Sequence, residues 1–484
     1  MRTNPHILEI NTRAWLRRLE AKHGRRFALH EIPDEYWREF KAQGFDAVWM
    51  MGVWTPSPKA AEIARSLTDI KDQIRQINPD FKTEDIIASP YAVYEFEPAA
   101  DLGGRESLKK LREKLNSMGM ALFLDFVSNH TAIDSPAVSE APDLYINTGM
   151  ETPYAHKDWF FQNDKGVWVA YGRDPYFAPW TDTAQLNYFN PNTREFMLQN
   201  LLKVADMCDG VRCDMAMLSL NKVHRDTWWE FIGGNLPKQE FWSVALERVR
   251  EKYPDFVFVA EVYWGLEWEI QEMGFDYTYD KVLYDRLRFS TPENIKGHLG
   301  AEHLFQMRSI RFTANHDEEE SLKAFGREKS LAASTIIATL PGARMIYLFQ
   351  MQGHPARVPI QYAADMFEED APILAYYSKL LQIASQPVFH GGEWSLTAVS
   401  PVAEEEWSFL NVLCWTWKQM NTASTVMINY SDHPAKCLLK IKTSSAHIHE
   451  EFSGEDVVIS EEEKSRGIWV ELKPFESKIF TYNI

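Results

Sequence analysis

Cysteine is scarce in this chain of 484 residues. The four cysteines, Cys208, Cys213, Cys414 and Cys437, are spaced neither like zinc ligands nor like a dense disulfide framework. This spacing favours free, mostly buried thiols in a reducing compartment. We therefore expect a cytoplasmic protein.

Long apolar runs and basic clusters are also missing. No stretch approaches the roughly 18 apolar residues of a membrane-spanning helix, and residues 1–18 carry charges throughout, without the apolar core of a signal peptide. The 51 basic and 69 acidic side chains give a net charge of −18. Nucleic acid and anionic membranes are therefore poor candidates as partners, and nothing in the sequence indicates an oligomeric state.

The sequence does contain short apolar segments that alternate with amphipathic ones. Amphipathic segments such as 106–118 have apolar side chains at helical spacing and end at glycine. Eight segments are typical of buried strands: 7–11, 46–54, 121–126, 211–214, 256–262, 275–279, 310–314 and 345–349. Eight strands that alternate with helices predict an α/β fold of the (β/α)8 or TIM-barrel type.

Two segments do not fit the barrel repeat. Residues 131–191, after the third strand, are too long for one connection and poor in helical periodicity, so we expect an insertion between barrel residues 1–130 and 192–391. Residues 392–484 contain short β-rich runs with no helical stretch between them, which predicts a C-terminal antiparallel β-sandwich domain. We expect Glu461 to Glu463 to form a solvated turn.

The fourth strand carries the first indication of chemistry. Side chains alternate between the two faces of a strand, so Arg212 and Asp214 share one face. A neighbouring cation lowers the pKa of a carboxyl group and keeps it ionised, as a nucleophile requires. The alternative is an ion pair that only completes the strand.

Further polar residues follow other strands at the same end of the barrel. Asp125, Asn129 and His130 follow the third strand, Glu261 ends the fifth, and His316 and Asp317 follow the seventh. Active sites of these barrels lie at the carboxyl ends of the strands. Crowded carboxyl groups divide into one that stays protonated and one that stays charged. Cleavage of a glycoside with retention requires that pair of groups.

Four ordered segments resemble the signature regions of the alpha-amylase superfamily, glycoside hydrolase family 13. They are Asp125-Phe-Val-Ser-Asn-His130, Asp209-Gly-Val-Arg-Cys-Asp214, Val259-Ala-Glu-Val-Tyr-Trp264 and Phe312-Thr-Ala-Asn-His-Asp317. Each segment alone is a weak signal, but four in the right order, each at the end of a predicted strand, are specific. The resemblance extends over the barrel, the insertion and the β-rich tail.

The resemblance implies roles for individual residues. Asp214 would be the nucleophile, Glu261 the general acid/base, and Asp317 the carboxylate that holds sugar hydroxyls. Arg212 would orient Asp214. Further substrate contacts would come from three side chains: His130 and His316 as hydrogen-bonding groups, and Tyr91 as the residue that stacks beneath the sugar.

Some positions differ from the family pattern or remain open. Met217-Leu218 replaces the Lys-His pair of many starch hydrolases, and Gln185 replaces the usual acid of a fifth region. Asn129 matches a calcium-binding position of many relatives, but the matching acidic ligands are not evident. We therefore expect no metal or other cofactor. A structural, hydrogen-bonding role for Asn129 is at least as well supported as a metal site. Trp264 is either a sugar platform or rim packing. The segment Arg357–Gln361 is distinctive and has no assigned role.

The predicted function is that of a retaining alpha-glycosidase with a covalent glycosyl-enzyme intermediate. Its substrate would be an alpha-glucan, a maltooligosaccharide or a small alpha-glucoside. The alternatives are a transglycosylase, synthase or phosphorylase that uses the same site, because fold does not settle the reaction. A non-catalytic barrel protein is a further alternative, against which the set Asp214, Glu261 and Asp317 argues.

Overall fold

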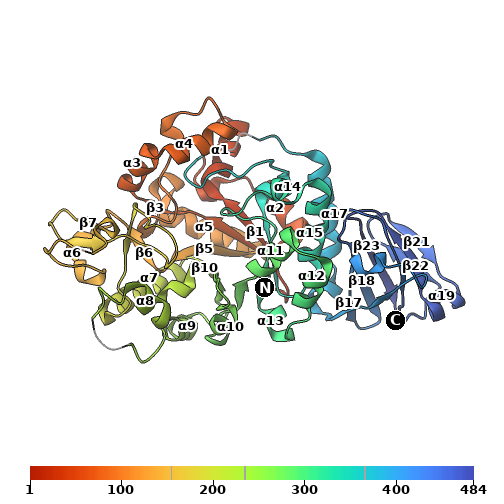
Figure 1. The fold of residues 1–484 in the computed structure, drawn as a ribbon. Helices are drawn as coiled ribbons and strands as arrows, with labels where there is room; N and C mark the ends of the chain where they lie inside the picture. The colour runs from red at the N-terminus through yellow and green to blue at the C-terminus, as the bar shows by residue number, and fades with distance from the viewer. Residues whose placement is uncertain (154, 234–235, 365–366) are drawn as a thin grey trace.

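The computed structural model describes residues 1–153, 155–233, 236–364 and 367–484. Figure 1 shows a central barrel, a small region formed by α6, β6 and β7 on one side of it, and a β-rich domain at the C-terminal end on the other side. Within the described ranges, none of the helices combines the length and apolar character that a membrane crossing would need.

The centre of the molecule is a closed barrel of eight parallel strands. Going round the barrel, the order is β1, β14, β13, β12, β11, β10, β5 and β2, so the first strand pairs with the last and closes the sheet. Their bounds are β1 His6–Asn11, β2 Ala47–Met51, β5 Ala121–Val127, β10 Gly210–Asp214, β11 Val257–Ala260, β12 Tyr277–Tyr279, β13 Ser309–Arg311 and β14 Ala343–Tyr347. The predicted barrel and its eight strands are confirmed.

Strand ends differ from the sequence prediction where the hydrogen-bonded ladder stops. The seventh strand was expected over 310–314, but β13 pairs with β14 only through Ile310 and Arg311. The eighth was expected over 345–349, but β14 ends at Tyr347 and α16, Leu348–Gln352, begins at the next residue. Apolar composition alone does not distinguish a buried strand from the buried helix that follows it.

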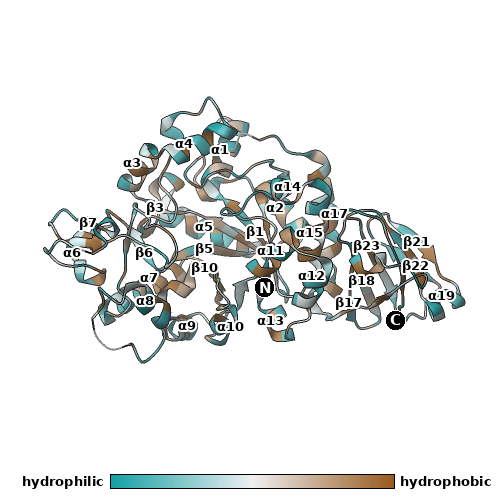
Figure 2. Ribbon diagram, in the orientation of Figure 1, coloured by the Kyte–Doolittle hydropathy of each residue, from teal (hydrophilic) through white to brown (hydrophobic). Residues whose placement is uncertain are grey.

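Helices surround the barrel because each buries one apolar face against the strands. In α5, Leu108, Leu111 and Leu115 are buried while the lysines face outward. Hydrophilic and hydrophobic stretches therefore alternate along these helices in Figure 2. The helices of this part are α1 Thr12–His23, α2 Asp34–Ala42, α3 Pro58–Ser66, α4 Thr68–Ile77, α5 Gly104–Ser117, α7 Pro191–Ala205, α8 Asn221–Trp228, α9 Phe241–Lys252, α10 Glu267–Glu272, α11 Lys281–Phe289, α12 Pro292–Leu299, α13 His303–Met307, α14 Ser321–Phe325, α15 Arg327–Thr339, α17 Ala371–Ala384 and α18 Pro387–Gly391.

The connection between β5 and β10 contains short elements of its own. They are β6 His130–Ala132, α6 Pro136–Glu140, β7 Phe160–Gln162, β8 Trp168–Ala170 and β9 Thr183–Gln185, with β6 paired to β9 and β7 to β8. An antiparallel pair, β3 Trp54–Pro56 with β4 Val93–Pro98, lies in the connection after β2. The insertion after the third barrel strand is therefore present, and its bounds at 131 and 191 stay a prediction.

The C-terminal domain consists of two antiparallel sheets with apolar side chains between them. One sheet has six strands and the other three. The strands are β15 Glu393–Leu396, β16 Val399–Ser400, β17 Val412–Gln419, β18 Thr422–Asn429, β19 Ala435–Leu439, β20 His447–Glu450, β21 Glu455–Val458, β22 Ile468–Leu472 and β23 Ser477–Asn483. The predicted β-sandwich is confirmed, although the sequence did not indicate β20 and β21.

The expectation of a turn at Glu461 to Glu463 is wrong, because these residues begin a short helix, α19 Glu461–Arg466. The Ser460 side chain accepts a hydrogen bond from the Glu463 amide, and the Glu463 carboxylate accepts one from the Ser460 amide. This capping box, together with acidic residues in the first turn, stabilises a helix start.

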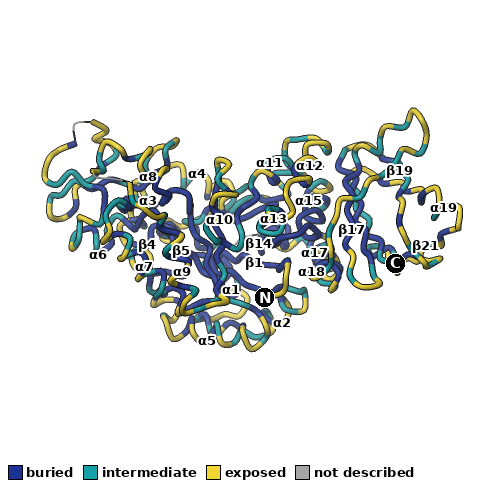
Figure 3. The backbone as a smooth tube through the Cα atoms, turned by 90° about the horizontal axis from the view of Figure 1, so that it is seen from below, coloured by how far each residue is buried: buried dark blue, intermediate teal, exposed yellow. Residues whose placement is uncertain are grey.

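The C-terminal domain and the barrel share a core. Trp417 of β17 donates its indole N–H to the carbonyl of Thr339 at 2.7 Å, and the Tyr430 hydroxyl donates to the carbonyl of Leu287 at 2.7 Å. Buried side chains of β17 and β18 belong to the same apolar cluster as the barrel strands. In Figure 3 the central strands β1, β5 and β14 and the facing strand β17 are buried. The tail is therefore a packing partner of the barrel.

Candidate active site

The predicted site residues come from the carboxyl ends of neighbouring barrel strands. Asp214 is the last residue of β10, Glu261 directly follows β11, and Asp317 lies in the connection after β13. Asp125 lies near the end of β5, the neighbour of β10. Because all strands of the barrel are parallel, these ends meet at one face.

One guanidinium group contacts all three predicted catalytic carboxylates. Arg212 is 2% exposed, and its Nη1 lies 2.6 Å from Asp214 Oδ1. Its Nη2 lies 2.6 Å from Glu261 Oε2 and 3.9 Å from Asp317 Oδ2. The structure therefore brings the three acids together around a single buried cation.

Glu261 accepts hydrogen bonds on both carboxylate oxygens. Besides Arg212, the backbone N–H of Met215 donates to Oε2 at 2.8 Å, and the Tyr263 hydroxyl donates to Oε1 at 2.7 Å. Burial raises the pKa of Glu261, and Asp214 and Asp317 raise it further, while Arg212 opposes the rise. A carboxyl group with a raised pKa is suited to act as a general acid.

The pKa of Asp214 differs from the sequence expectation. Burial raises it, and Arg212 only partly offsets this rise. The neighbouring cation alone predicts a decrease. Burial reverses the direction, and the 6% exposure of Asp214 results from the surrounding strands, which its own segment does not indicate.

His316 lies between two carboxylates. Its Nε2 is 2.9 Å from Asp317 Oδ2, and its Nδ1 is 2.5 Å from Oε1 of Glu9 in β1. Burial alone would lower the pKa of His316, but Asp317 and Glu9 outweigh it and raise this pKa to about 10. The side chain of Asp317 is 45% exposed, and His316 and Arg212 hold the pKa of Asp317 below its usual range. His316 is therefore an imidazolium ion, and Asp317 is ionised.

Tyr91 forms one wall beside these groups. Its ring stacks on the His316 ring at a centroid distance of 5.1 Å, and its hydroxyl lies 2.6 Å from His316 Nε2. The same hydroxyl lies 3.4 Å from Asp125 Oδ1, and Asp125 also accepts the Gly52 N–H at 2.9 Å. Burial raises the pKa of Asp125 to about 6. Tyr91 is thus fixed by contacts to residues from different strand ends.

His130 contacts Tyr91, and Trp264 contacts Tyr176. His130 Nε2 is 3.2 Å from the Tyr91 carbonyl oxygen, and burial lowers the pKa of His130 to about 4, so this histidine is neutral. Trp264 is 40% exposed and meets the edge of the Tyr176 ring, from the insertion, at 5.0 Å. Its φ of 67° places it in the left-handed region. Trp264 therefore belongs to the rim, where either of its two predicted roles remains open.

The model of the alpha-amylase catalytic domain matches residues 40–371 of this chain, which include all three carboxylates. The chain belongs to the alpha-amylase family. It is 27% identical over 271 residues to Alpha-amylase MalA of Haloarcula japonica, a match that covers 54% of this chain and 36% of that protein. It is 25% identical over 302 residues to Alpha-amylase 3 of Dictyoglomus thermophilum, with coverage of 57% and 55%.

Solved structures of alpha-amylases have the same overall fold as this alpha-amylase family chain. Maltogenic alpha-amylase AmyB from Thermotoga neapolitana superposes with a TM-score of 0.70 at 19% identity, over 100% of this chain and 99% of that one. The alpha-amylase from H. orenii gives a TM-score of 0.69 at 18% identity, over 100% of both chains. The chain spans between about a third and just over half of the two curated relatives above.

The position that suggested calcium does not fit a metal in this alpha-amylase family chain. Asn129 and Gln185 form a reciprocal amide pair, in which Gln185 Nε2 donates to Asn129 Oδ1 at 2.9 Å and Asn129 Nδ2 donates to Gln185 Oε1 at 3.2 Å. The Asn129 oxygen that a cation would need is thus already used. Among the described residues, no three His, Cys, Asp or Glu side chains are arranged to hold a metal ion. The pair instead connects the residue that precedes β6 to the last residue of β9.

Three residues of the site were not predicted from the sequence. Glu9 and Tyr263 contact His316 and Glu261 as described above. Arg357, from the segment without an assigned role, donates from Nη1 to the Asp317 carbonyl at 2.9 Å and from Nη2 to Gln73 Oε1 at 3.3 Å. A charged residue inside the apolar first strand was the only signal for Glu9, and its partner lies 307 positions away.

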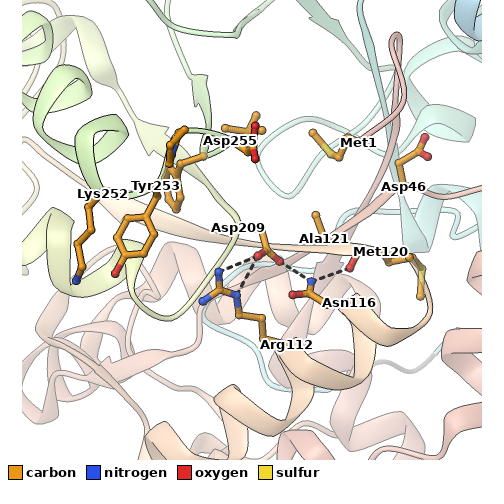
Figure 4. Close-up of a pocket in the computed structure, with 14 residues that line it drawn as sticks. Met1, Asp46, Arg112, Asn116, Met120, Ala121, Asp209, Lys252, Tyr253 and Asp255 are labelled. Atoms are coloured by element: carbon orange, nitrogen blue, oxygen red, sulfur yellow. Dashed lines mark hydrogen bonds and ion pairs between the residues drawn. The ribbon is translucent and has the colours of Figure 1, made fainter.

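A cavity of about 530 Å³ lies at the opposite, amino-terminal end of the barrel (Figure 4). Its lining includes Asp46, Ala121, Asp209 and Val257, which precede or begin four barrel strands. Asp209 is held there by Arg112 at 2.9 Å and by Asn116 at 2.8 Å. Polar residues at this end of a barrel serve stability, so the cavity is not part of the candidate active site.

Proposed function

We propose that the protein is a retaining alpha-glycosidase that cleaves its substrate by double displacement. The observation that carries this proposal is the contact of Arg212 with Asp214, Glu261 and Asp317 at one face of the barrel. Retaining glycosidases require a nucleophilic carboxylate and a second carboxyl group that first donates and later accepts a proton.

In the first step, Asp214 attacks the anomeric carbon of the sugar. The bond to the leaving oxygen breaks, and that oxygen takes the proton of Glu261. Arg212 lies against both groups, so it holds them in a fixed relation and favours the ionised form of Asp214 against the effect of burial. The product of this step is a covalent glycosyl-enzyme with Glu261 ionised.

In the second step, Glu261 takes a proton from water, and the oxygen of that water attacks the anomeric carbon. Asp214 leaves, so the sugar is released with its original configuration and both carboxyl groups return to their starting states. Asp317 holds sugar hydroxyls and offsets the positive charge that develops on the ring. Tyr91 is the stacking surface beneath the sugar, and its attachment to His316 supports that role.

The proposed substrate is an alpha-glucan, a maltooligosaccharide or a small alpha-glucoside. Membership of the alpha-amylase family and the names of the similar proteins, among them a Maltogenic alpha-amylase of Bacillus acidopullulyticus, support this class. We place the reaction in the cytoplasm, which agrees with four free, buried cysteines.

Transfer to another acceptor is the second candidate function. A sugar hydroxyl or phosphate can resolve the same glycosyl-enzyme in place of water. Met217 and Leu218, which replace a polar pair of many starch hydrolases, are 0% and 3% exposed and fill the core. The part of the site that receives the acceptor molecule therefore lacks those polar groups. This favours transfer of the sugar to another acceptor over ordinary internal cleavage of starch.

The deciding experiment is product analysis by NMR with maltooligosaccharides, sucrose and trehalose, each with and without phosphate. Release of the alpha anomer at early times supports the retaining hydrolase. Longer oligosaccharides or a sugar phosphate would assign the protein to the transfer class. Release of the beta anomer would refute double displacement, and no conversion of any substrate would favour a non-catalytic barrel.

A further inference from the structure

Glu9 is a buried carboxylate that contacts the site from the first barrel strand. It lies in β1, where its neighbours along the strand, Leu8 and Ile10, are apolar. Its side chain is 0% exposed. Its Oε1 lies 2.5 Å from His316 Nδ1 and accepts the His316 backbone N–H at 3.3 Å, while its Oε2 accepts no hydrogen bond within the described part of the chain. Both of these hydrogen bonds of the Glu9 carboxylate therefore come from His316.

A buried carboxylate of this kind requires a cation. Removal of an ion from water is unfavourable unless the ion is paired at short distance. His316 is the cation at that distance, and it also lies between Glu9 and Asp317, 2.9 Å from the latter. The two carboxylates therefore share one imidazolium, with one ring nitrogen facing each.

We propose that Glu9 is a positioning residue that acts through His316 to fix the charge and orientation of Asp317. The inference rests on the proposed function of Asp317 in glycoside cleavage. A neutral imidazole has a single N–H, whereas an imidazolium donates from both nitrogens. Glu9 occupies Nδ1 and keeps the ring charged, so that Nε2 remains a donor toward Asp317.

Several other groups face the pair from the elements around it. The Trp49 ring meets the His316 ring edge-on at 5.5 Å, and the Tyr91 hydroxyl lies at 2.6 Å from Nε2. The titratable and charged groups around Glu9 and His316 are Tyr91, Asp125, Arg212, Asp214, Tyr279, Asp317 and Tyr347. Of these, Arg212 is the cation, and its guanidinium donates to Asp214 and Glu261 at 2.6 Å each, while it lies 3.9 Å from Asp317. Removal of the charge of Glu9 therefore acts on His316 first.

The test replaces Glu9 by glutamine, which keeps size and one hydrogen bond but removes the charge. The titration of His316 is followed by NMR of protein with ¹⁵N-labelled histidine, assigned with His316→Gln. In the wild type, His316 remains an imidazolium through neutral pH. In Glu9→Gln, we expect its midpoint to fall by about 1 to 3 pH units, the usual effect of one adjacent charge.

The pH profile of kcat/KM provides the second readout. Above the new midpoint, the neutral ring of His316 in Glu9→Gln donates from Nδ1 to the amide oxygen of the introduced glutamine and no longer donates to Asp317. Activity should therefore decline at a lower pH in the variant than in the wild type, with a loss in kcat and not only a rise in KM. A purely structural role for Glu9 would lower activity without moving the profile.

Glu450→Gln is the matched control. Glu450 is also a buried glutamate, 7% exposed, but it accepts backbone N–H groups in the C-terminal domain. Its substitution should leave both the His316 titration and the pH profile unchanged.

Three results would overturn the proposal: a neutral His316 at pH 7 in the wild type, an unchanged midpoint in Glu9→Gln, or an unchanged pH profile. The first measurement does not use Glu9→Gln, so it can overturn the proposal even if that variant does not fold. Glu9→Asp, which keeps the charge, should retain the high midpoint. If the wild type converts no alpha-glucoside, the proposed function fails, while the titration still tests the link from Glu9 to His316.

Discussion

Removal of the Tyr263 hydroxyl should change the pH at which Glu261 loses its proton. Tyr263 donates to Glu261 Oε1 at 2.7 Å, and burial raises the pKa of Tyr263 well above its usual value, so this residue remains a neutral donor throughout the working range. A donated hydrogen bond favours the ionised carboxylate and lowers its pKa. Tyr263→Phe should therefore raise the pKa of Glu261.

The size of the effect follows from the hydrogen bonds that remain. Glu261 keeps Arg212 and the Met215 amide on its other oxygen. A hydrogen bond to a charged group contributes about 1.5 to 3 kcal/mol, and about 1.4 kcal/mol corresponds to one pKa unit. We take the low end, because the protonated carboxyl group keeps part of the interaction, and expect a rise of about 1 unit.

The assay is the dependence of kcat/KM on pH, whose alkaline limb reports the general acid of the free enzyme. In Tyr263→Phe that limb should move to higher pH by about one unit. Tyr430→Phe is the control, since it removes a buried hydroxyl that donates to Leu287 at the domain interface. A limb that stays in place, or moves to lower pH, would refute the reasoning.

Three further predictions concern catalysis, stability and metal dependence. Asp214→Asn should abolish turnover while the fold and the thermal midpoint stay nearly unchanged, and substantial residual activity would show that the nucleophile is assigned wrongly. The pKa of His316 is raised in the folded state, so the stability that His316 contributes is complete below about pH 6.5 and should be lost as the pH rises toward about 10. Denaturant titrations at several pH values can detect this decline. The variant His316→Gln should not show it. Because the amides of Asn129 and Gln185 satisfy each other, a chelator should leave the thermal midpoint unchanged, and a marked decrease would reveal a metal site.

Much of the barrel could be predicted because its signal is local. A strand buried on both faces is apolar along its whole length, and the helix beside it is amphipathic. The predicted segments 121–126 and 106–118 therefore match β5 and α5 to within two residues, without knowledge of their partners. The carboxylates proposed to be catalytic could be placed at one face of the barrel for a related reason, since the end of a predicted strand fixes the face on which a residue lies.

What could not be predicted depends on partners distant in the sequence. Glu9 looks like an isolated charge in an apolar strand until β13 brings His316 beside it. The pKa of Asp214 is raised because the whole barrel buries this side chain. The sequence of one five-residue strand does not indicate that burial. The helix at Glu461 differs from the prediction for another reason. Three successive glutamates are typical of a solvated turn, but the capping box of Ser460 and Glu463 begins a helix there.

The single cation at the centre of the site also limits how the contributions of its neighbours can be separated. Arg212 is hydrogen-bonded to Asp214 and Glu261 and ion-paired with Asp317 through one planar group, so these interactions are coupled to one another. Free energies measured for single substitutions of groups in one network do not add. The energetic share of each acid therefore cannot be obtained by summing single variants, and the four side chains have to be treated as one thermodynamic unit.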